Sequence, residues 1–379
     1  MKITLKDGSV KEYAESKSVY DIALDLSEGL ARAACCGKVD GEVVDLRTVL
    51  DKDCELQICT AADAEGLATI RHTASHVLAE AVKTLFPDAK LTIGPSIDTG
   101  FYYDFDHVSF SREDLDKLEA EMKKIIKKGE KLEKFTLPRE EAIQLMKEKD
   151  EPYKVELIEA LPEGEEISFY RQGEFVDLCA GPHLMSTKGI KAFKLTSSSM
   201  AYWHGDSSKA QLQRIYGTAF NKKEELEEKA KQEAKINKEN EVVAKAVENA
   251  TVDIPEVMIE RQMDRMLNDI RYRLSMQGIS LEDYCKFTGT TMDAMKAEMK
   301  GDAERRVKTQ LVLDAIVKAE DIKADPEAVE KKLDEYCAQF GDRAAEFKEK
   351  LSEDDKAYFE DQAVLDKTLE MLCDSAVEK

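Results

Sequence analysis

The sequence predicts an α+β fold over roughly its first two thirds and an all-helical remainder. Short alternating apolar runs separated by turn residues fill residues 1–61, helical and strand-like runs alternate up to about residue 220, and no strand pattern follows. All five His precede residue 205, whereas eight of the 13 Met follow residue 250. One folding unit seldom divides its residues so sharply. We therefore predict three domains, at 1–61, 62–221 and 222–379.

The composition is that of a globular protein with several domains. A length of 379 residues suits two or three domains, and 42% hydrophobic residues suffice for a core. No run approaches the ~18 apolar residues that span a bilayer, and the N-terminus has no apolar signal segment. We therefore expect a cytoplasmic protein with no membrane partner, whose eight scattered Cys are reduced thiols. The net charge of −22 argues against a general basic field for nucleic acid, but not against a local basic patch.

Residues 1–61 predict a small α+β domain. Asp7-Gly8 and Asp40-Gly41 are hairpin turn signals between alternating apolar residues. Residues 18–34 (SVYDIALDLSEGLARAA) are expected to form one helix, and CELQICT at 54–60 a closing strand.

A helix is predicted over residues 63–86, with an apolar stripe that ends before Pro87. Beyond it we expect strands and turns at 90–110, a helix that starts at the capping box of Ser111 and Asp114, a helix from Pro138 to Met146, and strand-like pieces over 153–220, of which YKVELI at 153–158 is the first.

Two short His-containing motifs carry the chemistry. His72 and His76 stand four residues apart on the predicted helix and therefore share a face, while Cys179 and His183 form a CxxxH that follows the strand end at Asp177. Either pair alone is more often incidental, but together they hold three of the five His. Imidazole exchanges protons near neutral pH, and imidazole with thiolate suits zinc, so the four groups are expected to converge on one water or metal. No Glu follows His72, which excludes a zinc-protease HExxH site.

Longer phrases extend this pattern to a family. Four stretches of the sequence resemble, in order and spacing, the editing domain of bacterial threonyl-tRNA synthetases. They are IRHTASHVLAEAVKTLFPDAKLTIGPSIDTGFYYDFD, PYKVELI, FVDLCAGPHL and AYWHGDSSKAQLQRIYGTAF. The opening domain resembles the ubiquitin-like β-grasp (TGS) domain of that family, so the resemblance covers about residues 1–221. It implies hydrolytic removal of serine wrongly attached to threonine tRNA, and hence a tRNA partner. A missing methyl group supplies only about 1–3 kcal/mol of discrimination, so a second site is needed.

The same resemblance assigns the site residues. It implies that His72, His76, Cys179 and His183 line the site, while Lys154 and Asp177 orient the substrate and move protons. The related alanyl enzymes use this pattern around zinc, whereas the threonyl family works with water, so zinc is a candidate ligand of the cluster and not a requirement. Outside this set, Tyr102 and Tyr103 are assigned to the pocket or to the core, His107 to a structural role, and His204 to a position where the family more often has Arg.

Residues 226–379 resemble a different family, the C-terminal chaperone region of bacterial trigger factor. The phrases that carry the resemblance are NATVDIPEVMIE and YRLSMQGISLEDYCKFTG. Apolar residues recur at helical spacing from Ile254 onwards, which suits either a core or a surface for unfolded polypeptide. They are Ile254, Met258, Met263, Met266, Ile270 and Leu274.

Three functional hypotheses follow from the two resemblances. The chain is an editing hydrolase with a helical appendage, a binder of unfolded chains whose editing site is idle, or the product of a chimeric gene. The complete His and Cys set favours the first over an idle site, whereas the domains of both families that are missing at the join favour the third as the history of the gene. We expect neither ligase activity nor ATP binding, because the aminoacylation motifs are missing from the sequence, and no prolyl isomerase activity. We also expect weak tRNA binding from so acidic a chain.

Overall fold

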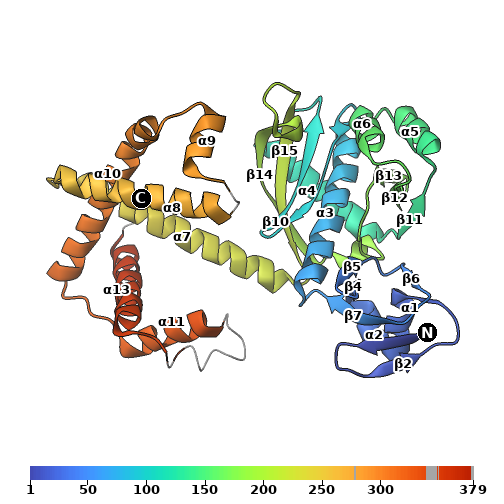
Figure 1. Ribbon diagram of the computed structural model, residues 1–379, viewed down its shortest axis with the longest axis horizontal. Helices are drawn as coiled ribbons and strands as arrows, with labels where there is room; N and C mark the ends of the chain where they lie inside the picture. Colours follow the sequence, from blue (N-terminus) through green and yellow to red (C-terminus); the bar gives the residue numbers. More distant parts are fainter. Residues whose placement is uncertain (277–278, 339–347, 349, 377–379) are drawn as a thin grey trace. The chain divides into compact units, whose positions relative to one another are not determined.

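A computed structural model describes residues 1–276, 279–338, 348 and 350–376. The chain forms two compact units, residues 1–230 and 231–379. The first unit mixes helices and strands, and the described part of the second contains helices only, so the predicted fold class is confirmed (Figure 1). No described helix is both long and apolar enough to cross a membrane.

The first 60 residues build a five-stranded sheet of order β2-β1-β7-β4-β5. Both predicted hairpin turns are present, with Gly8 at φ +81° and Gly41 at φ +92°, a backbone region that glycine enters freely. The core of this N-terminal domain contains Ile3, Ile22, Leu46 and Leu56. The elements are β1 (Lys2–Leu5), β2 (Val10–Glu12), β3 (Lys17–Ser18), α1 (Val19–Leu26), α2 (Glu28–Ala33), β4 (Ala34–Val39), β5 (Glu42–Val44), β6 (Val49–Leu50) and β7 (Cys54–Thr60).

The single helix expected over 18–34 is wrong, because the chain forms two helices, α1 and α2, with a break at Ser27. Ser27 is extended, with φ −170° and ψ 147°, and its hydroxyl accepts a hydrogen bond from the Leu30 amide at 3.0 Å. Serine thus caps the second helix and ends the first, a preference that apolar periodicity does not reveal.

The next domain packs helices against two antiparallel sheets. The long helix α3 (Ala64–Leu85) and helix α4 (Arg112–Lys128) cover one face of the sheet of order β14-β15-β10-β8, with Phe101, Tyr103 and Phe105 buried between them. The predicted capping box of Ser111 and Asp114 begins α4. The remaining strands are β8 (Lys90–Leu91), β9 (Ser96–Ile97), β10 (Gly100–Asp106), β11 (Leu132–Thr136), β12 (Ser168–Gln172), β13 (Phe175–Leu178), β14 (Ala192–Tyr202) and β15 (Gln211–Phe220), with α5 at Arg139–Glu148.

The strand expected at YKVELI is also wrong. Residues Pro152–Ala160 form a helix, α6, with Pro152 in its first turn and Lys154 and Ile158 buried. Proline pre-sets the backbone angle of a first helical turn, and a short apolar run does not distinguish a strand from a buried helix. This correction matters for function, because α6 carries Lys154.

The second unit is helical throughout its described part. Helix α8 packs on α9 and α10, and α13 packs on α10 and α11. Ile259 and Leu267 are the buried residues of α8, and the predicted stripe residues beside them, such as Met263, are half-buried. Gln277-Gly278, part of the second trigger-factor phrase, lies outside the described residues. The helices are α7 (Lys223–Asn249), α8 (Glu256–Met276), α9 (Leu281–Thr288), α10 (Met292–Ala319), α11 (Pro326–Ala338) and α13 (Glu353–Ser375).

Candidate active site

Helix α3 presents two histidines to one place. His72 and His76 lie one turn apart, with ring centroids 5.3 Å apart and ring planes perpendicular. The surrounding turns of α3 are buried, including Thr69, Thr73 and Ser75, so the helix is held on both sides of the pair. Spacing along the helix and burial of its flanks therefore fix the two rings relative to each other.

The segment after β13 brings Cys179 and His183 against these rings. The His183 ring centroid lies 4.1 Å from those of both His72 and His76. The Cys179 Sγ lies 3.3 Å from His72 Nε2 and 3.2 Å from His183 Nε2. One potential ligand atom from each of the four residues lies within 4.8 Å of the other three, so this group could hold a metal ion.

Hydrogen bonds behind the rings determine which nitrogens carry protons. His72 Nδ1 lies 3.2 Å from the Pro182 carbonyl oxygen, which only accepts, so Nδ1 is the donor. Thr73 Oγ1 donates to the Thr69 carbonyl at 2.8 Å, so it accepts from His183 Nδ1 at 3.3 Å. In the neutral rings the Nε2 atoms of His72 and His183 are therefore unprotonated, and each directs a lone pair towards Cys179. The single S–H of Cys179 can donate to only one of them.

Asp177 organises the other side of the cluster. Its carboxylate is fully buried, accepts a hydrogen bond from Tyr103 Oη at 2.7 Å and pairs with Lys154 Nζ at 2.6 Å. His76 Nε2 lies 3.7 Å from the same carboxylate. Strands β10 and β13 and helix α6 thus deliver a tyrosine, a carboxylate and an ammonium group to one buried network. Such a pair is tolerated inside a protein only when its geometry is well satisfied.

Burial sets the protonation states of the cluster. It lowers the pKa of His72 to about 4 and that of His76 to about 3, and it lowers the pKa of His183 well below its usual value. Burial also raises the pKa of Cys179 to about 12. For Asp177, burial acts to raise the pKa, but Lys154, His76 and the hydrogen bonds outweigh it and leave the pKa lowered. At pH 7 the imidazoles and the thiol are therefore neutral, beside a charged Asp177.

All six residues selected from the sequence come together in the structure. His72, His76, Cys179 and His183 form the cluster, and Asp177 links it to Lys154. Their catalytic roles stay predictions.

The sequence did not assign Tyr103 its place at Asp177. Its signal is the alternation of β10, which turns Tyr103 towards α3 while its neighbour Tyr102 stacks under Arg214, 3.8 Å from the guanidinium carbon to the ring centroid. The other two histidines do not belong to the cluster, since His107 is largely exposed and His204 lies 3.4 Å from Glu156 at the surface.

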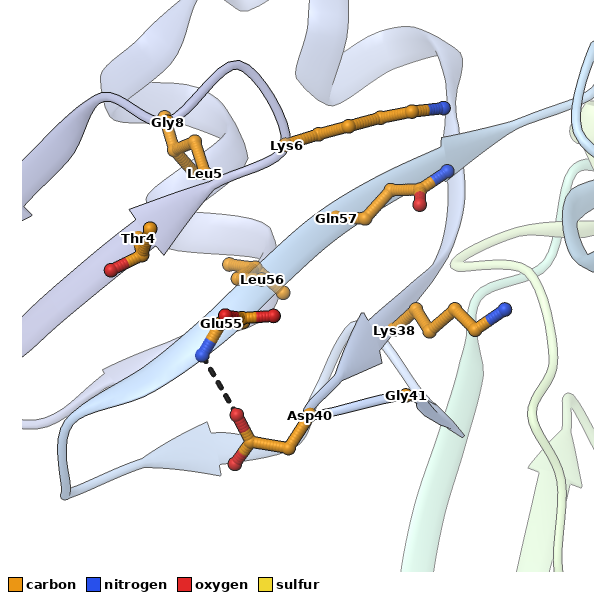
Figure 2. Close-up of a pocket in the computed structure, with 10 residues that line it drawn as sticks. All are labelled: Thr4, Leu5, Lys6, Gly8, Lys38, Asp40, Gly41, Glu55, Leu56 and Gln57. Carbon is orange, nitrogen blue, oxygen red and sulfur yellow. Dashed lines mark hydrogen bonds between the residues drawn. The ribbon is translucent and has the colours of Figure 1, made fainter.

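A hollow of about 470 Å³ lies elsewhere, on the N-terminal sheet. Figure 2 shows Lys38 and Gln57 extending from the neighbouring strands β4 and β7, and Lys6 extending from the turn after β1. The Glu55 amide donates to Asp40 at 2.8 Å within it, and Lys38 is paired with Glu65 at 2.7 Å. None of the six residues selected from the sequence lines this hollow, which mixes acidic and basic groups.

Three parts of the chain match protein families. Residues 1–60 match the TGS domain, and residues 167–216 match the threonyl and alanyl tRNA synthetase second additional domain. Residues 221–374 match the bacterial trigger factor protein C-terminus. The three matches cover residues 1–60, 167–216 and 221–374 of the chain. The resemblances seen in the sequence are confirmed.

Curated relatives of the N-terminal part are threonine–tRNA ligases. That of Clostridium botulinum (strain Alaska E43 / Type E3) is 62% identical over 245 residues, which are 64% of this chain and 38% of the relative. That of Acetivibrio thermocellus is 61% identical over 228 residues, which are 60% of this chain and 36% of the relative. This chain therefore spans well under half the length of these relatives.

One solved structure is similar to a smaller part of the chain. It is described as "Structures of and interactions between domains of trigger factor from Themotoga maritim", with a TM-score of 0.30 and 18% identity over 38% of this chain and 83% of that one.

Proposed function

We propose that this protein hydrolyses the ester bond of threonine tRNA mischarged with serine. The observation that carries the proposal is a cluster of two buried residues, His76 and His183, and two half-buried ones, His72 and Cys179, beside the Asp177–Lys154 pair. The chain is about 60% identical to threonine–tRNA ligases over this part. The TGS and synthetase-type domain matches support a tRNA substrate.

The chemistry of ester hydrolysis matches the groups present. A water molecule must lose a proton as it attacks, and a neutral imidazole with a free Nε2 lone pair can accept it. The Nε2 lone pairs of His72 and His183 both face Cys179, whose S–H can occupy only one of them, so the other stays free. The Lys154 ammonium offers a charged donor to the developing oxyanion or the leaving ribose oxygen, and Asp177 fixes its direction. His76, in contact with Asp177, connects the His72–Cys179–His183 group with the Asp177–Lys154 pair.

The same donor set fits zinc, which the proposed reaction does not require. Three imidazoles and the thiolate that Cys179 would form on metal binding are zinc ligands. The Nδ1 atoms of His72 and His183 are held by Pro182 and Thr73, as second-sphere partners hold metal-binding imidazoles. If bound, zinc would lower the pKa of a coordinated water.

Deacylation of seryl-tRNA is the direct test. We expect the full chain to release serine faster than threonine from threonine tRNA, and expect His72→Ala and Cys179→Ala each to reduce the rate about 100-fold or more. The control is His107→Asn, since His107 is largely exposed and has positive φ, which asparagine tolerates. It should retain the wild-type rate.

The outcomes separate the hypotheses. Activity that survives both substitutions would sink the proposed site, and no serine release by a folded protein would sink the enzyme proposal. The assay is repeated after treatment with a chelator. Activity that stops there and returns with added zinc would contradict the metal-free reaction.

The second unit has a feature of its own that favours a second function, binding of unfolded polypeptide. Tyr272 and Met276 on α8 are 67% and 73% exposed, and Phe287 on α9 is 84% exposed. Exposed flexible and aromatic side chains suit promiscuous apolar contacts. We expect the full chain to suppress aggregation of chemically denatured lysozyme, and expect Met276→Ser with Phe287→Ser to halve that effect. Tyr358→Ser, also exposed, is the control. Equal losses from both changes would contradict a defined surface.

A further inference from the structure

A loop of the TGS domain extends to the back of the candidate site. Residues 45–48 connect β5 to β6, and the second of them, Leu46, is completely buried in the TGS core. The loop is closed by the Thr48 amide, which donates to the Asp45 carbonyl at 3.0 Å, and the Tyr20 amide donates to Leu46 at 2.9 Å. The loop is therefore anchored to its own domain before it contacts the next one.

Asp45 holds the backbone of a site residue. It is only 5% exposed, and its Oδ2 accepts hydrogen bonds from the His183 amide at 3.1 Å and from Tyr170 Oη at 2.8 Å. The Tyr170 ring in turn contacts the His183 imidazole, with centroids 4.4 Å apart. One carboxylate thus restrains both the main chain of His183 and a side chain against which its ring packs.

Arg47 completes the restraint from the same loop. Its guanidinium pairs with Asp45 at 2.8 Å and donates to the carbonyls of His183 at 3.3 Å, Leu184 at 3.0 Å and Leu132. Two residues beyond His183, Met185 packs against the TGS core. Buried carbonyls need donors, and here an arginine of the neighbouring domain supplies them.

We propose that Asp45 and Arg47 are positioning residues for His183, so that the TGS domain sets the geometry of the hydrolytic site. The effect on catalysis rests on the proposed function, but the restraint itself does not. The alternative is that these residues only join two domains. Another contact between the same domains distinguishes the two ideas, because Lys38 pairs with Glu65 at 2.7 Å, seven residues before His72 on α3.

Substitution at Asp45 in the full chain tests the proposal. We expect Asp45→Ala to lower the kcat of seryl-tRNA deacylation about 10–100-fold with KM within about twofold, because small misplacements of a reacting group cost that much. Asp45→Asn keeps one acceptor oxygen and should recover part of the rate. The matched control Lys38→Ala should leave kcat unchanged.

Amide hydrogen exchange of the peptide that contains residues 179–186 supplies a readout that needs no activity. We expect faster exchange there in Asp45→Ala, and wild-type exchange in Lys38→Ala. If the wild type releases no serine, the proposed function fails, and exchange alone decides whether Asp45 restrains the segment. An unchanged kcat beside faster exchange would overturn the positioning role, as would equal exchange in both variants. Arg47→Lys, which keeps the charge but not the fork of donors, should show the same pattern if Asp45→Ala does not fold.

Discussion

Replacement of Asp177 by asparagine is expected to destabilise the domain of residues 62–221 by about 3–5 kcal/mol and to abolish deacylation. The substitution leaves the Lys154 ammonium buried without its counterion, and an uncompensated buried charge is costly. Urea unfolding followed by tryptophan fluorescence measures the effect. The single Trp of the chain, Trp203, is buried beside Tyr153 in this domain, so the signal reports this domain.

Two further variants make this result specific. Asp104→Asn removes another buried carboxylate of the domain, but its partner Arg214 is one quarter exposed and can be hydrated, so we expect a smaller loss. Adding Lys154→Met to Asp177→Asn should restore much of the stability and none of the activity. If the substitutions at Asp177 and Asp104 cost the same, burial of the Lys154 charge is not the cause.

Acidification from pH 7 to pH 5 is expected to destabilise the same domain. Burial lowers the pKa of His72 to about 4 and that of His76 to about 3, whereas both titrate near 6.5 in an unfolded chain. Below pH 6.5 the unfolded chain therefore binds protons that the folded chain does not, and stability falls as the pH drops towards the folded pKa values. At pH 5 the loss is about 2 kcal/mol for each of these two rings.

The measurement is the tryptophan-monitored unfolding free energy at several pH values, in the presence of a chelator. The lowered pKa of Asp177 adds a loss only at still lower pH, because its unfolded value is near 4. His76→Gln should reduce the slope between pH 6 and pH 5 by close to one proton, whereas His107→Asn should not change it. A slope that His76→Gln leaves unaltered would show that His76 is not held neutral by burial.

The sequence determined the features that depend on neighbours along the chain. Helical spacing placed His72 and His76 on one face, and the capping box of Ser111 began α4 where it was predicted. The Asp7-Gly8 and Asp40-Gly41 turns closed their hairpins. These outcomes follow from local backbone preferences and hydrogen bonds a few residues apart, which a sequence displays directly.

Other features depend on surfaces that meet only in the folded protein. YKVELI became a helix that buries Lys154 against Asp177. Tyr103 meets Asp177 across 74 residues, and Asp45 meets the His183 amide across 138. Neither pair has a signature in its own surroundings, because each contact exists only after sheet register and domain packing have brought distant residues together. The sequence by itself therefore determined the four-residue His and Cys cluster, and only the tertiary structure decided what holds that cluster in place.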